Sequence, residues 1–109
     1  MTGRITTHVL DTARGTAGAG MRVSLRRISP TSVSHVEITL DLNGRAELIG
    51  PEQLVAGLYE LLFEVGEYFG NSAGFLDQVP VRFRVADTAV HYHIPLIVSP
   101  FGYSTYRGR

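Results

Sequence analysis

The chain alternates apolar and polar residues over several short stretches, and this alternation predicts β-strands. Met21, Val23 and Leu25 are separated by arginine and serine, and the same period of two returns around residues 36–41 and 79–86. Because successive side chains of a strand point to opposite faces, such stretches favour strands that are buried on one face. Further strands are predicted from β-branched or apolar runs, which brings the expected total to about eight. These runs cover residues 5–10, 58–65, 91–98 and 103–106.

Turn-forming residues separate these strands. Glycines crowd residues 15–20, Ser29-Pro30 interrupts a strand, and Asn43-Gly44 is a dipeptide favoured where the backbone φ must be positive. A short helix is expected at residues 66–74, limited to about two turns by its glycines. Many short strands joined by turns predict an all-β sandwich, formed by a single domain that spans residues 1–109.

Composition excludes several kinds of chemistry. The 109 residues contain no cysteine, which rules out disulfides, thiolate metal sites and thiol nucleophiles. All ten basic residues are arginine, which rules out a Schiff-base lysine. Ten acidic residues balance them, so there is no electrostatic footprint for nucleic acid. No apolar run approaches the roughly 18 residues of a membrane span, and we expect a cytoplasmic protein.

His91 and His93 point to the same face of the last long strand, because they are two residues apart. Imidazole has an unperturbed pKa of about 6.5, so a histidine that faces a cleft is a suitable general base. The same His-x-His spacing suits a metal ion, with His8 as a third ligand. We disfavour a zinc hydrolase because the chain lacks cysteine and a further histidine-rich motif. His35 lies in a polar stretch and is expected at the surface.

Two further polar residues allow more than one interpretation. A lone strand histidine such as His8 is, more often than not, partly buried and hydrogen-bonded to the backbone. Arg45 follows a predicted tight turn, where arginine is usually solvated, but its planar guanidinium could hold and polarise a carbonyl group. Ser104 has no Gly-x-Ser-x-Gly motif around it, so a serine nucleophile is not expected. From the residues alone, the structural and functional interpretations of His8 and Arg45 both stay open.

Three blocks of the sequence resemble one known family. They are Ile5-Thr-Thr-His8-Val-Leu-Asp11-Thr-Ala-Arg-Gly15, Asn43-Gly44-Arg45, and the stretch from His91 to Arg109 that ends Tyr-Arg-Gly-Arg. Together they resemble the 5-hydroxyisourate hydrolases, the transthyretin-related enzymes of purine breakdown. The resemblance covers nearly the whole chain. It departs at Arg109, where the family usually ends in serine.

The resemblance implies a fold, an assembly and a reaction. The fold is a transthyretin-like sandwich of two four-stranded sheets with one short helix. The assembly is a homotetramer, a dimer of dimers, whose active sites lie along a channel at the dimer–dimer interface. The reaction is the hydrolysis of 5-hydroxyisourate to 2-oxo-4-hydroxy-4-carboxy-5-ureidoimidazoline in urate degradation, without a metal ion or a cofactor.

The resemblance also implies which residues form the site. His8, Arg45 and His93 match the family's catalytic and substrate-contacting residues, where transthyretin has a lysine, an acidic residue and a threonine. One histidine of the His8/His93 pair is the expected base; we favour His8, with His93 orienting the substrate or relaying the proton. Arg45 is expected to stabilise the oxyanion, and His91 to flank the pocket.

The closing segment is expected to bind substrate through Tyr106, Arg107 and Arg109. Transthyretin has a small residue at the position of Tyr106, so the tyrosine implies a shallow pocket suited to a small flat heterocycle. The alternative function is a non-catalytic, transthyretin-like binding protein. The hydrolase-type residues His8, Arg45 and His93 count against this alternative, and the departure at Arg109 keeps it open.

Overall fold

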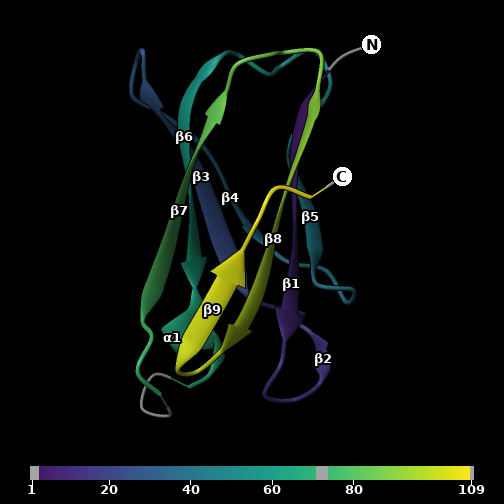
Figure 1. Ribbon diagram of the computed structural model, residues 1–109, viewed down its shortest axis with the longest axis vertical. Helices are drawn as coiled ribbons and strands as arrows, with labels where there is room; N and C mark the ends of the chain where they lie inside the picture. The colour runs from purple at the N-terminus through teal and green to yellow at the C-terminus, as the bar shows by residue number, and fades with distance from the viewer. Residues whose placement is uncertain (1–2, 71–73, 109) are drawn as a thin grey trace.

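The computed structural model describes residues 3–70 and 74–108, which form a sandwich of two β-sheets (Figure 1). The all-β class predicted from the alternation is confirmed. In chain order the elements are β1 (Arg4–Asp11), β2 (Thr16–Ala17), β3 (Arg22–Ser29), β4 (Val33–Thr39), β5 (Arg45–Ile49), β6 (Gly57–Glu64), α1 (Val65–Tyr68), β7 (Gln78–Val85), β8 (His91–Ser99) and β9 (Gly102–Thr105). No helix in this part of the chain is long and apolar enough to cross a membrane.

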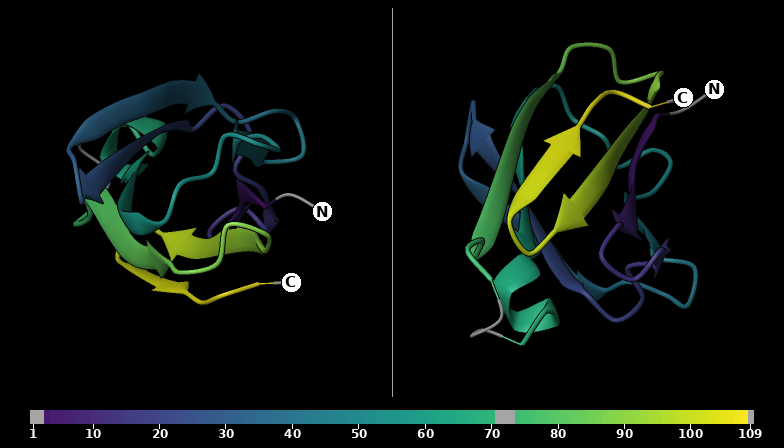
Figure 2. Two further views of the ribbon diagram at one scale, coloured as in Figure 1. Left: turned by 90° about the horizontal axis from the view of Figure 1, so that it is seen from above. Right: turned by 60° about the horizontal axis from the view of Figure 1, so that its bottom comes forward.

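The two sheets have different numbers of strands. One has the order β2-β1-β8-β9 with β5 also beside β1, and the other has the order β4-β3-β6-β7. Figure 2 shows the two layers facing each other. The resemblance implied four strands in each sheet, and the described residues add a fifth strand, β2, to the first. The chain turns at Gly15, with a φ of 71°, and β2 pairs with the end of β1.

The centre of the five-stranded sheet is a parallel pair, β1 and β8, from opposite ends of the chain. Their register runs from Arg4 beside His91 to Asp11 beside Val98. Parallel strands require a long crossover connection, and here the whole second sheet lies between them in sequence. The first and last sequence blocks are therefore side by side, as the purple β1 and the olive β8 are in Figure 1.

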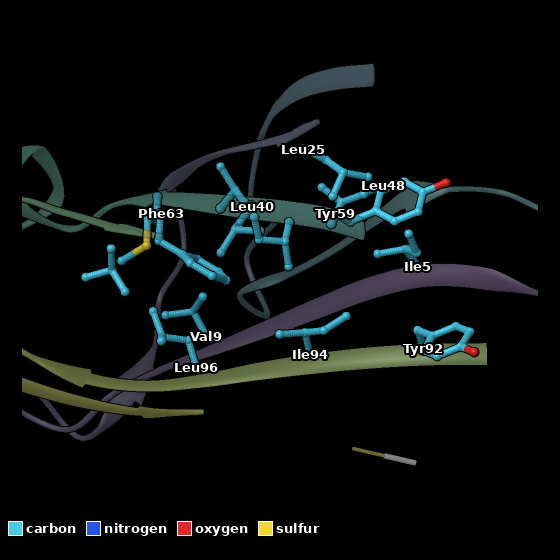
Figure 3. Packing of buried hydrophobic residues seen from close by; sticks show 14 of the residues in the cluster. Ile5, Val9, Leu25, Leu40, Leu48, Tyr59, Phe63, Tyr92, Ile94 and Leu96 are labelled. Carbon is cyan, nitrogen blue, oxygen red and sulfur yellow. The ribbon is translucent and has the colours of Figure 1, made fainter. Parts of the chain in front are cut away.

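The core lies between the sheets and is formed by alternate, inward-pointing side chains. Ile5 and Val9 of β1 face Tyr59 and Phe63 of β6 across the core, and all four are fully buried (Figure 3). Removing apolar surface from water contributes about 25 cal/mol per Å², so these positions fix which face of β1 points inward. The alternate residues of β1 are left on the outer face of the sheet.

The helix is shorter than expected. It covers Val65–Tyr68, whereas the sequence predicted residues 66–74. Gly70 then adopts a φ of 93°, a left-handed conformation that ends a helix and that glycine adopts without strain. Residues 71–73 of the predicted range lie outside the described part of the chain.

The expectation that His35 lies at the surface is only partly correct, because its side chain is half-buried. Its ring stacks on the buried Tyr59 with centroids 5.8 Å apart, and its Nε2 atom is buried. The register of β3 with β4 shifts between Leu25 and Arg26, which leaves His35 unpaired in the ladder. Such a bulge re-aims a side chain, and a polar stretch of sequence gives no sign of it.

Asp11 ties the end of β1 to the loop and the helix beside it. Its buried carboxylate accepts hydrogen bonds from the backbone N–H groups of Ala13 and Arg14, both at 3.0 Å, and from the Tyr68 hydroxyl at 2.8 Å. The guanidinium of Arg14 lies 3.5 Å from the same carboxylate. One buried side chain therefore joins three separate segments.

We expect Asp11→Ala to lower the free energy of unfolding by about 2–3 kcal/mol, because two N–H groups and a partly buried hydroxyl lose their acceptor. Urea unfolding followed by circular dichroism measures the loss. Asp87→Ala is the matched control, since the exposed Asp87 carboxylate accepts one N–H, that of Ala89. The control should lose less than a third as much, and equal losses would contradict this account of Asp11.

Candidate active site

His8 and Arg45 are cross-strand partners of β1 and β5 on the outer face of the five-stranded sheet. A turn places the arginine: the Asp41 carboxylate accepts the N–H of Asn43 at 2.8 Å and that of Arg45 at 3.0 Å. Gly44 has a φ of 70° in this turn, as predicted for the Asn-Gly pair. Arg45 is thereby placed beside His8, near enough for its charge to lower the pKa of the imidazole.

His91 and His93 lie on the outer face of β8, next to β1. Their ring centroids are 6.1 Å apart. The hydroxyl oxygen of Thr6 is 2.6 Å from Nε2 of His91 and 2.8 Å from Nδ1 of His93. The parallel register creates this contact, because it pairs Thr6 with His93. The two histidines of the His-x-His motif are therefore joined through one hydroxyl of the neighbouring strand.

The C-terminal segment covers another side of the His93 ring. The N–H of Gly108 donates to the carbonyl of His93 at 2.7 Å. A Cβ at position 108 would lie 2.6 Å from Cδ2 of His93, so glycine is needed for the backbone to pack against the imidazole. The guanidinium of Arg107, 4.8 Å from the centroid of the Tyr92 ring, anchors this segment.

Two cavities adjoin His93. The larger, about 310 Å³, is lined by residues of β1, β5, β8 and the turn before β5, namely Thr6, Thr7, Asp41, Arg45, Ala46, Glu47, His91 and His93. The smaller, about 260 Å³, lies between β7 and the C-terminal segment, and Tyr106 and Arg107 are among its lining residues. His93 contributes to both cavities and separates the two groups of predicted site residues.

The predicted site residues thus fall into three groups. His8, Arg45 and His93 come together on one outer face, where the charge of Arg45 lowers the pKa of both histidines after the larger effect of burial. Tyr106 and Arg107 lie on the other side of His93. Arg109 lies outside the described residues.

The surroundings of the histidines favour their neutral forms. Burial and then the positive charge of Arg45 lower the pKa of His8, against a smaller opposite effect from the neighbouring turn. Burial also lowers the pKa of His93, and after burial come the charges of His91, Arg45 and His8. Desolvation and a nearby positive charge both disfavour an imidazolium. Near pH 7 these imidazoles can therefore accept a proton.

The arrangement places a proton acceptor, His93, and a fixed cation, Arg45, at one cavity. His8 pairs with Arg45 on the same face but is not among the residues that line this cavity. Neutral imidazoles can take a proton from water, and the guanidinium can stabilise a negative oxygen that develops on a substrate. In residues 3–70 and 74–108, no group of three or more histidine, aspartate or glutamate side chains is arranged to hold a metal ion. The geometry suits acid–base chemistry on a small polar substrate.

Thr6 is a member of the site that the sequence reasoning missed. Its position, two residues before His8 on the same strand, was a signal that it shares the outer face. Its contact with the two histidines of β8 could not be foreseen, because the parallel register of β1 with β8 is not visible in the sequence.

The fold and the site define a transthyretin-like β-sandwich with a histidine- and arginine-lined outer face. Residues 5–108 match the sequence model of the HIUase/Transthyretin family. The chain belongs to this family. The identification from three sequence blocks, and the transthyretin-like sandwich that it implied, are confirmed.

Several known proteins are similar over the whole chain. The 5-hydroxyisourate hydrolase of Mesorhizobium japonicum is 45% identical over 97% of this chain and 92% of its own length. The solved structure of 5-hydroxyisourate hydrolase from Klebsiella pneumoniae has a TM-score of 0.86 and 29% identity, over 98% of this chain and 99% of that one. The structure of (S)-allantoin synthase has a TM-score of 0.91 and 38% identity over 99% of this chain, which spans only 44% of that protein's length.

We expect Arg45→Ala to raise the pKa of both His8 and His93, because a positive charge that disfavours their imidazolium forms is removed. NMR titration of the histidine ring protons measures both values. Arg27→Ala is the control, since Arg27 acts on the distant His35. It should raise the pKa of His35 alone. Unchanged His8 and His93 titrations in Arg45→Ala would mean that the three groups are not electrostatically coupled.

Proposed function

We propose that the protein is a 5-hydroxyisourate hydrolase, which opens the six-membered ring of 5-hydroxyisourate with water and yields 2-oxo-4-hydroxy-4-carboxy-5-ureidoimidazoline in urate degradation. Curated relatives with this name match nearly the full chain. The observation that carries the proposal is that His8, Arg45 and His93, which match the hydrolase signatures, lie on one outer face of one sheet. We assign the activity to a single domain, residues 1–109, supported by the family match over residues 5–108.

A neutral imidazole is the base in the proposed mechanism. One histidine of the His8/His93 pair takes a proton from water while the water oxygen attacks a ring carbonyl carbon. We favour His8 as this base, with His93 orienting the substrate or relaying the proton. The lowered pKa of each histidine supports this role, because it keeps a lone pair available near pH 7. General-base catalysis typically contributes about 10²- to 10⁴-fold.

Arg45 is the proposed electrostatic partner. As water adds, negative charge develops on the attacked carbonyl oxygen, and the guanidinium stabilises it. The ring carbon–nitrogen bond then breaks, the carbonyl carbon becomes a carboxylate, and the departing nitrogen takes a proton. One such donor is typically worth about 10² to 10³ in rate. The proposed mechanism uses no metal ion and no cofactor.

The closing segment is proposed to contact the substrate through Tyr106, Arg107 and Arg109. For the first two residues, this is supported by the cavity that they line together with His93. The bulk of Tyr106 favours a shallow pocket and a small flat heterocycle. For Arg109 the proposal rests on the family resemblance alone.

The alternative is a non-catalytic, transthyretin-like binding protein. One measurement separates it from the hydrolase: the absorbance decay of freshly generated 5-hydroxyisourate with and without the protein. Faster decay in proportion to protein concentration supports the hydrolase. An unchanged decay rate, together with retained ligand, would support the binding protein.

We expect His8→Ala, Arg45→Ala and His93→Ala each to lower the rate of catalysed ring opening by at least about 10²-fold, as for the loss of a general base or an oxyanion donor. His91→Ala should lose far less, about tenfold at most, because His91 is exposed and flanks the cavity. Initial rates of absorbance decay measure all four variants.

EDTA treatment is the control for a metal-assisted reaction, and we expect it to leave the rate unchanged. Equal losses for His91→Ala and His93→Ala, combined with sensitivity to EDTA, would contradict the metal-free mechanism. That result would restore a metal site on the His-x-His motif.

We also propose a homotetramer, a dimer of dimers. In the described sheets, β7 and β9 each form an edge, and an exposed strand edge can pair with another subunit. Leu10, 38% exposed, lies beside Ile97 on the outer face of the same sheet as the candidate site. The proposed cytoplasmic location rests on the sequence, which has no run apolar enough for a membrane span.

Light scattering at micromolar concentration should therefore give about four times the chain mass of 11.9 kDa. Leu10→Glu should weaken the assembly, because it places a charge on an apolar face that the partner covers. Thr39→Glu, a polar-to-charged change on the opposite sheet, is the matched control and should leave the mass unchanged. A stable and fully active monomer would rule out the proposed assembly.

A further inference from the structure

The Thr6 hydroxyl connects two histidines of different exposure. Its oxygen lies 2.6 Å from Nε2 of the exposed His91 and 2.8 Å from Nδ1 of the half-buried His93. Both distances are within the range of hydrogen bonds. The other nitrogen of His93, Nε2, has no hydrogen-bond partner within residues 3–70 and 74–108, so it is the ring atom that can meet substrate or water.

One hydroxyl carries one hydrogen, and this limits the two imidazoles. Thr6 can donate to only one ring nitrogen and must accept from the other. When both rings are neutral, one of the two nitrogens that face Thr6, Nδ1 of His93 or Nε2 of His91, therefore carries a hydrogen and the other does not. If Nε2 of His93 is to accept a proton, its Nδ1 must carry that hydrogen, and Thr6 must then donate to His91. The tautomers of the two histidines are coupled.

We propose that Thr6 is a positioning residue that joins His93 to His91 as a proton relay between the candidate active site and solvent. The inference rests on the proposed hydrolase function, in which His93 orients the substrate or relays a proton. It adds roles for two residues: Thr6 selects the tautomer of His93, and His91 exchanges the proton with water.

The relay conserves protons and charge. His93 takes a proton at Nε2, its Nδ1 hydrogen moves to the Thr6 oxygen, and the Thr6 hydrogen moves to Nε2 of His91. Thr6 ends as a neutral hydroxyl, His93 as a neutral ring with its hydrogen on Nε2, and His91 as an imidazolium. When the shift reverses, the extra hydrogen of His91 returns through Thr6 to Nδ1 of His93 while Nε2 of His93 protonates the departing ring nitrogen, and this restores the first state.

The charges around the relay favour this outward direction. Burial opposes an imidazolium at His93, and so do the charge of Arg45 on β5 and any positive charge on His91 or His8. His91 is exposed to water, which stabilises the charged form. Two carboxylates line the same cavity: Asp41, which holds the turn, and Glu47, which pairs with Arg4 at 3.4 Å. A positive charge is therefore better tolerated at the outer histidine.

The first test determines the tautomers directly by NMR. Long-range ¹H–¹⁵N correlation spectra of the ¹⁵N-labelled protein, at about pH 8, where neutral imidazole predominates, show which nitrogen carries hydrogen. We expect hydrogen on Nδ1 of His93 and none on Nε2 of His91. Thr6→Val should change the tautomers of both rings. Thr12→Val, which removes the hydroxyl bond from the residue just after β1 to the Val98 carbonyl of β8, should change neither. Unchanged tautomers in Thr6→Val would overturn the proposal, as would hydrogens on both nitrogens that face Thr6.

Kinetics test the relay itself. Thr6→Val should lower kcat about tenfold with little change in KM, while Thr6→Ser, which keeps the hydroxyl, should stay within about twofold of the native protein. The double variant Thr6→Val/His91→Ala should lose no more than Thr6→Val alone, because both changes interrupt one path. Losses that multiply, or a serine variant as slow as the valine variant, would overturn the relay.

The two measurements separate this inference from the proposed function. If the native protein does not accelerate ring opening, the hydrolase proposal fails, and with it the catalytic role of the relay. The tautomer spectra then still decide whether Thr6 couples the two histidines. If the protein is active and the coupling is absent, only the relay is wrong.

Discussion

The parallel pairing of β1 with β8 is the constraint on which the rest of the structure depends. It joins residues 87 positions apart, such as Thr6 and His93, in one register. A slip by one residue would turn every side chain of a strand to the opposite face. The buried Ile5 and Val9 prevent that slip, since they would lose their places in the core. The same alternation that fills the core therefore sets the outer face on which the candidate site lies.

The C-terminal segment adds a second constraint to the same histidine. Gly108 donates a hydrogen bond to the backbone carbonyl of His93 and packs against Cδ2 of its ring, while the Thr6 hydroxyl hydrogen-bonds Nδ1. The segment is itself held by Arg107 over the ring of Tyr92, whose hydroxyl accepts the N–H groups of Ala86 and Asp87 at 3.2 and 3.1 Å. His93 is thus fixed by contacts from both ends of the chain. A proton-transfer group requires such rigidity, because the distance between proton donor and acceptor must be held within fractions of an ångström.

The sequence predicted seven of the nine strands because their alternation or apolar character has a direct physical cause, burial in the core. It missed the two-residue β2 and also β5, where Arg45 was expected only to follow a turn. It predicted the turn at Asn43-Gly44 for a similar reason, a local need for positive φ. His8, Arg45 and His93 were found by family resemblance, since nothing in a lone strand histidine distinguishes a functional from a structural role. The contacts of Thr6 and the stacking of the half-buried His35 on Tyr59 were missed because both depend on strand pairing: a parallel register in one case and a bulge in the other. Pairing between distant strands leaves little trace in a single sequence.

The charge states at the candidate site give the imidazoles and the guanidinium different roles. Burial and the charge of Arg45 lower the pKa of His8 and His93, while guanidinium remains protonated at any ordinary pH. In the described part of the chain no carboxylate forms an ion pair with Arg45: Asp41 binds its backbone N–H, and Glu47 pairs with Arg4. The permanent charge of Arg45 is therefore available to a substrate, whereas the imidazoles stay neutral and able to exchange protons. A site that kept both kinds of group charged would repel itself, and one that paired Arg45 internally would have little left to offer a developing anion.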